Sequence, residues 1–235
     1  MNLKNKVVIV TGASEGIWEQ IALRLAKEGV RLALIARNSE KLVEVAKQAE
    51  SLWAQEVKTY SQDLSKTEEI SGLVGQITED FWGVDILINN AGIWQKMMQL
   101  DEIEAEKIDP IIATNLSAVV HLTHTVLPLL RKQEEGVILN IVSQSWVVAQ
   151  WGQSIYTATK YGVRWFTDVL KSDLKGSNVR VAGVYQAGTR TKMFENTWET
   201  MPLEKFADPA DLADIICYML AQPPKIWMHE VRVCY

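Results

Sequence analysis

The sequence is poor in cysteine and has no excess of basic residues, and both absences narrow the functions open to it. Only two cysteines occur among 235 residues, Cys217 and Cys234. Their spacing matches no metal site, and in a reducing cytoplasm we expect both to be free thiols. The net charge of −5 provides no broad basic surface, which argues against nucleic acid as a partner.

Long apolar runs are also missing. No stretch approaches the roughly 20 apolar residues needed to span a bilayer, so no membrane association is expected. The first residues, MNLKNKVVIVTG, pass from basic side chains into a short apolar run that ends at Gly12, unlike a signal peptide. The hydrophobic fraction of 48% and charged fraction of 23% are those of a globular protein. We therefore predict a cytoplasmic protein with a single domain over residues 1–235.

Short β-branched runs alternate with longer amphipathic stretches along the chain. The predicted strands are VVIV (7–10), LALIA (32–36), VKTY (57–60), DILIN (85–89), VILNIV (137–142), VRVAGVY (179–185) and HEVRV (229–233). The predicted helical stretches are 17–28, 40–52, 66–80, 104–131, 154–175 and 209–221. Continuously apolar strands that alternate with helices indicate a parallel sheet covered on both faces. The prediction is an α/β fold of the Rossmann type, doubly wound, with about seven strands.

The stretch TGASEGIW, residues 11–18, follows the first predicted strand and opens the first predicted helix. In that context two glycines, Gly12 and Gly16, can hold a pyrophosphate on the free N–H groups of a helix N-terminus. A glycine pair alone is equally compatible with an ordinary strand–helix turn. Other motifs decide between these readings.

Those motifs resemble the short-chain dehydrogenase/reductase family over nearly the whole chain. They are TGASEGIW (11–18), NNAG (89–92), Asn115, Ser143 and YTATK (156–160), in the order in which that family carries them. The ketoreductase and oxoacyl-thioester reductase branch is the nearest in character. The resemblance implies an enzyme that transfers a hydride between a nicotinamide cofactor and a carbonyl or secondary alcohol.

The resemblance also implies a set of residues that bind the cofactor. They are Gly12, Ser14, Glu15, Gly16, Ile17, Arg37, Asp63, Asn89, Ala91, Gly92, Tyr156, Lys160, Gly188, Thr189 and Thr191. Arg37 follows Ala36 where an acidic residue would bind the 2′-hydroxyl of NAD, and a guanidinium there can clamp the 2′-phosphate of NADP. NADP(H) is therefore favoured, with NAD(H) as the alternative, and an ordinary surface arginine remains a third explanation.

Four residues are expected to carry the chemistry. Tyr156 and Lys160 lie four residues apart on one predicted helix, hence on one face. A tyrosine has an ordinary pKa near 10, and a neighbouring cation favours its phenolate form, so Tyr156 is predicted to be the general acid/base. Ser143 would hydrogen-bond the substrate oxygen. The family resemblance implies that Asn115 orients a water molecule connected to Lys160.

Several further features have modest interpretations. His121 and His124 lie three residues apart on a predicted helix, but no other residues complete a metal site, so no metal is expected. The resemblance implies a homodimer or homotetramer that packs through the helices of Asn115 and Tyr156.

The loop from Gln186 to Thr191 lacks the proline and first glycine of the family pattern, which predicts altered loop rigidity. The partner is a small carbonyl or alcohol substrate, and the methionines at positions 97 and 98 suggest an apolar or amphipathic one, although packing of the loop explains them equally well.

The chain contains 9 tryptophans against only 13 glycines. Five of these tryptophans stand where relatives of the resembled family usually carry glycine, at positions 18, 53, 82, 146 and 165. Overpacking costs roughly 1–3 kcal/mol at each site, so five such sites would exhaust a typical margin of stability. We hypothesise that they are UGA codons read as tryptophan in a gene that uses UGA for glycine.

If Trp18 is genuine, we expect its indole to collide with the sheet or with the nicotinamide end of the cofactor. The alternative function is then an impaired relative that survives as a binding or scaffold protein.

Overall fold

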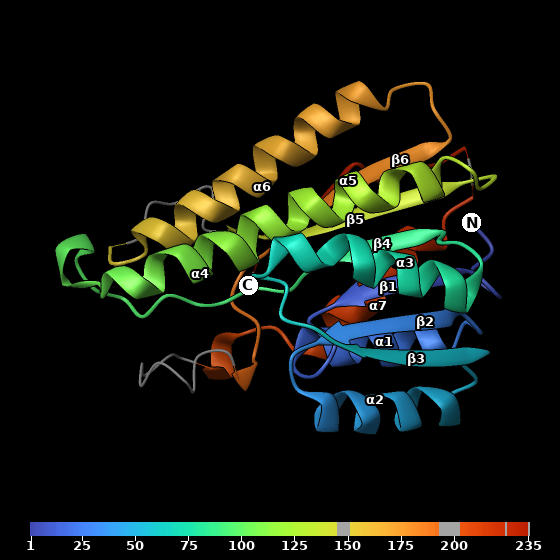
Figure 1. Ribbon diagram of the computed structural model, residues 1–235, viewed down its shortest axis with the longest axis horizontal. Helices are drawn as coiled ribbons and strands as arrows, with labels where there is room; N and C mark the ends of the chain where they lie inside the picture. The colour runs from blue at the N-terminus through green and yellow to red at the C-terminus, as the bar shows by residue number, and fades with distance from the viewer. Residues whose placement is uncertain (145–150, 193–202, 224, 235) are drawn as a thin grey trace.

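A computed structural model describes residues 1–144, 151–192, 203–223 and 225–234. Seven parallel strands form one sheet in the order β3-β2-β1-β4-β5-β6-β7. The strands are β1 (Val7–Thr11), β2 (Arg31–Ala36), β3 (Glu56–Ser61), β4 (Ile86–Asn89), β5 (Gly136–Ser143), β6 (Val179–Gln186) and β7 (Glu230–Val233). The helices are α1 (Ile17–Ala26), α2 (Ser39–Ser51), α3 (Ile70–Phe81), α4 (Ile108–Ile112), α5 (Ala118–Leu130), α6 (Ser154–Asp173) and α7 (Pro209–Leu220). The predicted Rossmann-type architecture is confirmed (Figure 1).

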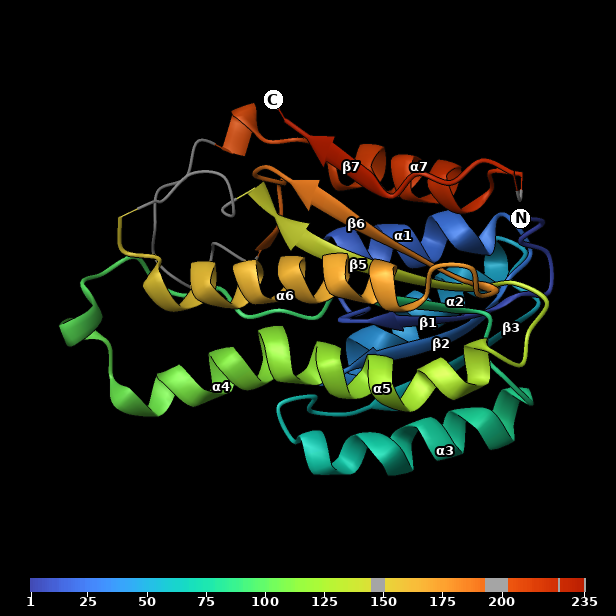
Figure 2. The ribbon, with the colours of Figure 1, turned by 90° about the horizontal axis from the view of Figure 1, so that it is seen from above.

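Helices cover both faces of the sheet, which explains why its strands are apolar throughout (Figure 2). In β1, Val8 and Val10 belong to the core beneath α1, α2 and α7, whereas Val7 and Ile9 belong to the core beneath α3, α5 and α6. Successive side chains of a strand point to opposite faces, so each strand supplies both cores.

The strand order reverses between β1 and β4, and this reversal places the functional end of the molecule. The chain winds outward from β1 to β3 and then returns to lay β4 against the other side of β1. In open α/β sheets, ligands bind in the crevice that such a reversal leaves at the carboxyl ends of the strands. The segments after β1, β4, β5 and β6 meet at this end.

Helix ends follow the expected chemistry. Asp208 accepts a hydrogen bond from the Ala210 N–H at 2.9 Å, with Pro209 as the first residue of α7. Gly29 adopts a φ of 69° shortly after α1 ends, and its N–H donates to the Ala26 carbonyl. Contrary to the expectation that no stretch is long enough, the helical stretch Ala105–Leu130 has the length and composition of a membrane span. In this fold its part α5 packs on the sheet and on α3, as a core helix does.

Three of the five unusual tryptophans lie on the surface. Trp53 and Trp82 are 72% and 90% exposed, and Trp165 is 64% exposed on α6. The expectation of overpacking is therefore wrong at these sites, because the indoles have solvent around them. The strain at Trp53 and Trp82 is instead in the backbone, with φ values of 79° and 64°, in the left-handed region that favours glycine. Residue 146 lies outside the described residues.

Candidate active site

The turn between β1 and α1 needs both of its glycines. Gly12 and Gly16 have φ values of 77° and 70°, which other residues adopt only with strain. A Cβ on Gly12 would come within 3.1 Å of the Ala91 Cα, and one on Gly16 within 3.2 Å of the Thr191 Cγ2. The backbone therefore runs close to the neighbouring loops, and α1 begins at Ile17 on the wall of a cavity.

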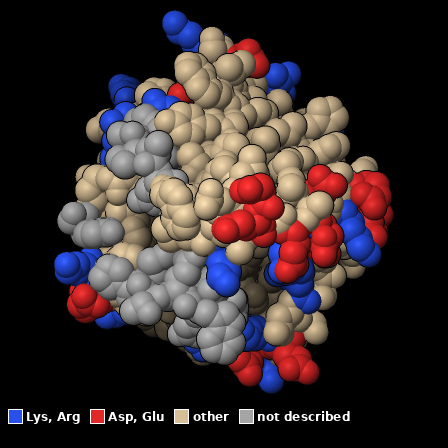
Figure 3. All heavy atoms as spheres, turned by 90° about the vertical axis from the view of Figure 1, so that its left-hand side faces the viewer, with Lys and Arg blue, Asp and Glu red and all other residues tan. Residues whose placement is uncertain are grey.

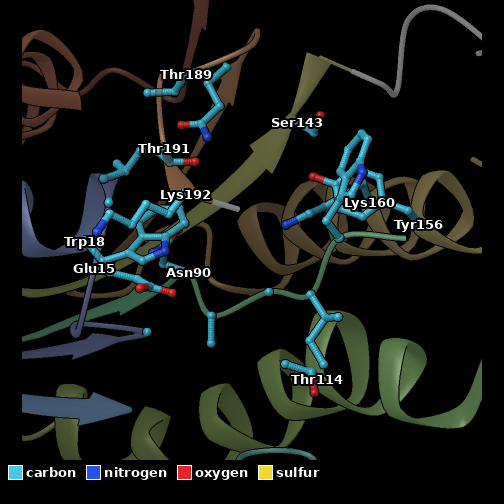
Figure 4. A pocket seen from close by; sticks show the side chains of 18 of the residues that line it. Glu15, Trp18, Asn90, Thr114, Ser143, Tyr156, Lys160, Thr189, Thr191 and Lys192 are labelled. Carbon is cyan, nitrogen blue, oxygen red and sulfur yellow. The ribbon is translucent and has the colours of Figure 1, made fainter. Parts of the chain in front are cut away.

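Trp18 occupies the third glycine position of this turn. Its indole is half-buried, packs against the core beneath α1 and lines the cavity. Figure 4 shows the Trp18 side chain at the same end of the cavity as Glu15, Thr191 and Lys192. A Cβ on Gly12 would lie 3.3 Å from the Trp18 Cδ1. The expected collision with the sheet is therefore wrong, since the side chain turns into the cavity, where it takes up room next to the glycine turn.

The cavity has a volume of about 1110 Å³ and lies at the carboxyl ends of the strands. Figure 3 views the molecule from this side. The lining of the cavity includes nearly all of the predicted cofactor residues: Gly12, Ser14, Glu15, Gly16, Ile17, Arg37, Asp63, Ala91, Gly92, Tyr156, Lys160, Gly188, Thr189 and Thr191. A ligand pocket for a small molecule usually measures about 300–1,000 Å³. The space, the positive-φ glycines and the helix N-terminus together fit a dinucleotide.

Asn89 is the exception, because its side chain points away from the cavity. Its Nδ2 donates to the Thr123 Oγ1 at 3.0 Å and to the Asn140 Oδ1 at 2.9 Å, within the core. The prediction that Asn89 lines the cofactor site is wrong. Asn90 lines the cavity in its place, and its N–H donates to the Thr11 Oγ1 at 2.8 Å. The motif alone did not separate these two asparagines, because the last residue of β4 faces the helices of the core.

Charged and polar side chains from the segment after β2 line one part of the cavity. Arg37, Asn38 and Lys41 all line the cavity there. Lys41 is paired with Glu15 at 2.5 Å, and this pair is about half-exposed. The Glu15 carboxylate raises the pKa of Lys41 through the hydrogen bond between them. Sequence reasoning missed Lys41 as a cation of this site, since it lies inside α2 and outside every motif.

Ser143, Tyr156 and Lys160 converge on the opposite end of the same cavity (Figure 4). Ser143 ends β5, whereas Tyr156 and Lys160 lie one turn apart near the start of α6. The Lys160 Nζ lies 5.7 Å from the centroid of the Tyr156 ring and 3.4 Å from the Ile141 carbonyl, to which it donates.

Burial controls the titration of both groups. It raises the pKa of Tyr156 to about 12, while a hydrogen bond with Ser143 acts in the opposite direction. Burial also lowers the pKa of Lys160 to about 8. The expected lowering of the Tyr156 pKa is therefore wrong for the protein alone, because desolvation of the phenolate outweighs the hydrogen bond with Ser143.

Asn115 lies behind the cavity, in a π-helical segment, Ala113–Ser117, between α4 and α5. It is fully buried. Its Oδ1 accepts from the Ile93 N–H at 2.7 Å and its Nδ2 donates to the Ile93 carbonyl at 3.0 Å. A π-helical turn widens the helix and often marks a functional site. Here its asparagine holds the backbone of the loop that follows β4.

The loop after β6 closes one side of the cavity. A Cβ on Gly188 would lie 2.6 Å from the Phe206 ring, so this position also needs glycine. The Ala207 N–H donates to the Gly188 carbonyl, and Arg190 forms an ion pair with Asp208. These bonds hold the loop without the proline that the family pattern carries, and they place Thr189 and Thr191 on the cavity wall.

Three aromatic side chains that sequence reasoning did not assign to the site line the cavity, and one of them packs against Tyr156. The Trp94 ring lies 4.7 Å from the Tyr156 ring, at an interplanar angle of 59°. Trp151 and Phe206 line the same cavity. Trp94 lies two residues after the NNAG motif, and this closeness was the signal in the sequence that could have assigned it to the site.

The remaining candidates stay outside the site. His121 and His124 are exposed on α5. No group of three metal-binding side chains occurs in the part of the chain that the structure describes. Cys217 and Cys234 are free thiols, the first buried and the second exposed.

The short chain dehydrogenase family model matches residues 6–202. An uncharacterised oxidoreductase of Staphylococcus saprophyticus is 33% identical over 234 residues, which cover 99% of this chain and 98% of the relative. An uncharacterised oxidoreductase of Staphylococcus aureus is 31% identical over 98% of this chain and 97% of its own length. This chain belongs to the short-chain dehydrogenase/reductase family.

Solved structures of short-chain dehydrogenases superpose closely on this one. An alcohol dehydrogenase from Thermococcus sibiricus, complexed with 5-hydroxy-NADP, has a TM-score of 0.89 at 27% identity, and the match covers 97% of this chain and 96% of the other. A short chain dehydrogenase from Shigella flexneri, complexed with NADP, has a TM-score of 0.90 at 25% identity, with 99% and 98% covered. As a short-chain dehydrogenase the protein is an oxidoreductase, and these neighbours support a nicotinamide cofactor.

Proposed function

We propose that this short-chain dehydrogenase is a carbonyl reductase or alcohol dehydrogenase that favours NADP(H). The observation that carries the proposal is that Ser143, Tyr156 and Lys160 line the same cavity as the glycine turn, with Asn115 bracing the loop between them. Two parts of the chain that are far apart in sequence thus present a cofactor cradle and a proton donor to one space. This arrangement argues against the alternative of an impaired binding protein.

A bound nicotinamide would supply or accept the hydride. Tyr156 would move the proton to or from the substrate oxygen through its Oη, and Ser143 would donate a hydrogen bond to that oxygen. Lys160, one helical turn from Tyr156, would place a positive charge that favours the phenolate when the site is filled. The aromatic wall of Trp94, Trp151 and Phe206 favours an apolar substrate.

The preference for NADP(H) rests on Arg37 and Lys41, which both line the cavity. The position where an acidic residue would bind the 2′-hydroxyl of NAD is occupied by Ala36. Two cations can bind the 2′-phosphate that NAD lacks. The names of two neighbours, which were solved with NADP and 5-hydroxy-NADP, point in the same direction.

We also propose that the protein is a cytoplasmic homo-oligomer. An apolar stripe of exposed side chains, Tyr161, Trp165 and Val169, runs along α6 at four-residue spacing. Exposed apolar patches mark interaction surfaces, and the stripe lies on the helix that carries Tyr156.

Titration with NADPH and NADH, followed by nicotinamide fluorescence, tests the proposal. We expect NADPH to bind at least about tenfold more tightly, a difference of about 1.4 kcal/mol. Turnover is then measured on a panel of apolar ketones, with Tyr156→Phe as the control that should bind cofactor and lose turnover. Binding of neither cofactor would defeat the enzyme assignment, and tighter NADH binding would defeat the role of Arg37.

A further inference from the structure

Gln95 is a buried polar residue outside every sequence motif, and it bonds to the start of the helix that carries Tyr156. It lies in the loop after β4 and is only 3% exposed. Its Oε1 accepts from the backbone N–H of Ile155 at 2.9 Å and from that of Tyr156 at 3.0 Å. Its Nε2 donates to the Gly152 carbonyl at 2.8 Å. All three bonds reach residues more than 50 positions away.

These bonds cap the N-terminus of α6 from another segment of the chain. The first N–H groups of a helix have no partner within it, and usually the residue before the helix accepts from the second or third of them. In α6 the preceding residue is Gln153, whose side chain makes no such bond. Gln95 accepts from both the second and the third residue. Because these N–H groups are buried, leaving them unpaired would be costly.

The loop that carries Gln95 is itself held from both sides. Asn115 brackets the backbone of Ile93 with two hydrogen bonds, of 2.7 and 3.0 Å. On the other side, the Met98 N–H donates to the Gly152 carbonyl at 3.2 Å. A Cβ on Gly152 would lie 2.8 Å from the Met98 N. Gln95 therefore sits in the middle of a rigid connection between Asn115 and the first turn of α6.

We propose that Gln95 is a positioning residue that fixes the backbone of Tyr156 and thereby the placement of its Oη beside Ser143. The inference rests on the proposed function, because it gives Tyr156 the proton transfer. Among the described residues, Gln95 is not part of the cavity lining, and its amide bonds to the backbone of Gly152, Ile155 and Tyr156. Its effect on the reaction is transmitted through two backbone bonds, and misplacement of a reacting group by about 1 Å can cost a hundredfold in rate.

The test replaces Gln95 with methionine, which keeps the length of the side chain and removes the amide. Gln95→Met should lower kcat roughly tenfold or more and leave the Kd for NADPH within about twofold. The primary deuterium isotope effect on kcat should rise, because the transfer step becomes slower. A partly unfolded sample would instead lower the apparent kcat and leave the isotope effect unchanged. Gln99→Met is the matched control, since Gln99 is exposed in the same loop and its N–H donates to the Glu102 carboxylate within the following 3-10 turn.

Amide hydrogen exchange at Ile155 and Tyr156 supplies a readout that needs no activity. Both amides should exchange faster in Gln95→Met than in Gln99→Met. Gln95→Glu keeps the acceptor and loses the donor, so it should retain protection at Tyr156 and a kcat above that of the methionine variant. If Gln95→Met does not fold, Gln95→Glu decides the question.

Unchanged kcat and exchange in folded Gln95→Met, or loss of both in folded Gln95→Glu, would overturn the proposal. A wild-type protein without turnover would instead defeat the proposed function, while the exchange result would still report on Gln95.

Discussion

Trp53 and Trp82 each follow a helix in left-handed backbone geometry, so their replacement by glycine is a sharp test of how the helix ends are built. Trp82 follows α3 with φ 64° and ψ 18°, and its N–H donates to the Thr78 carbonyl at 2.8 Å. Trp53 follows α2 with φ 79°, and its N–H donates to the Glu50 carbonyl. Glycine is the usual residue at such a position.

The expected gain follows from two opposing terms. A left-handed conformation costs a residue with a Cβ roughly 1–2 kcal/mol, and glycine relieves that cost. Glycine also makes the unfolded chain more flexible, which costs about 0.4–1 kcal/mol. Little burial is lost, because Trp82 is 90% exposed. The net gain is about 0.5–1 kcal/mol per site, so the double variant Trp53→Gly/Trp82→Gly should gain about 1–2 kcal/mol and roughly 2–8 °C in Tm.

The assay is urea unfolding followed by far-UV circular dichroism, since the substitutions change tryptophan fluorescence. Trp165→Gly is the control, because Trp165 is equally a surface tryptophan but lies inside α6. Glycine inside a helix lowers stability, here by about 0.5 kcal/mol. If the double variant is no more stable than wild type, or if Trp165→Gly gains as much, the backbone argument is wrong.

Four further predictions follow from the site and the surface. Glu15→Gln removes the carboxylate that holds Lys41 at 2.5 Å and should tighten NADPH binding about two- to fivefold, a surface ion pair being worth up to about 1 kcal/mol; an unchanged Kd by fluorescence titration would mean that Lys41 does not serve the phosphate. Burial lowers the pKa of Lys160 from 10.5 to about 8, so the unfolded state binds the proton more tightly and stability should rise between pH 8 and pH 10 by up to about 3 kcal/mol. The difference in unfolding free energy between wild type and Lys160→Met isolates this term from other groups, such as Cys217, and a difference that stays constant with pH contradicts it. Val169→Glu places a charge on the exposed stripe of α6 and should shift the protein to monomer by light scattering, whereas Val43→Glu, exposed on α2, should not. Peptide masses of the protein from its own organism should show glycine at positions 53 and 82 if the decoding hypothesis holds, and tryptophan there would refute it.

Much of the fold was predictable because it rests on local patterns. The seven apolar runs became seven strands, and no end of a strand lies more than one residue from its predicted position. The resemblance supplied the order of the motifs, and the parallel sheet then had to bring the segments after β1, β4, β5 and β6 to one end. The site residues that lie in those segments accordingly line one cavity.

Predictions that depended on the direction or surroundings of one side chain were less successful. Asn89 and Asn90 are neighbours in the motif, yet only Asn90 lines the cavity, because Asn89 ends β4 with its side chain bonded into the core, whereas Asn90 begins the loop that follows. The Tyr156 pKa rises because burial outweighs the hydrogen bond with Ser143, and burial is a property of the assembled core. Trp18 turns into the cavity instead of into the sheet, a choice that packing made.

The sequence by itself determined the fold class and the glycine turn, since strand periodicity and motif spacing are local properties of the chain, and its family resemblance named the four residues expected to carry the chemistry. Tertiary structure alone decided which group caps the helix of Tyr156. Gln95 is 61 positions away from that residue and belongs to no motif. Only the packing of the loop after β4 against the start of α6 makes it a partner, because buried N–H groups must donate to an acceptor that the fold brings near.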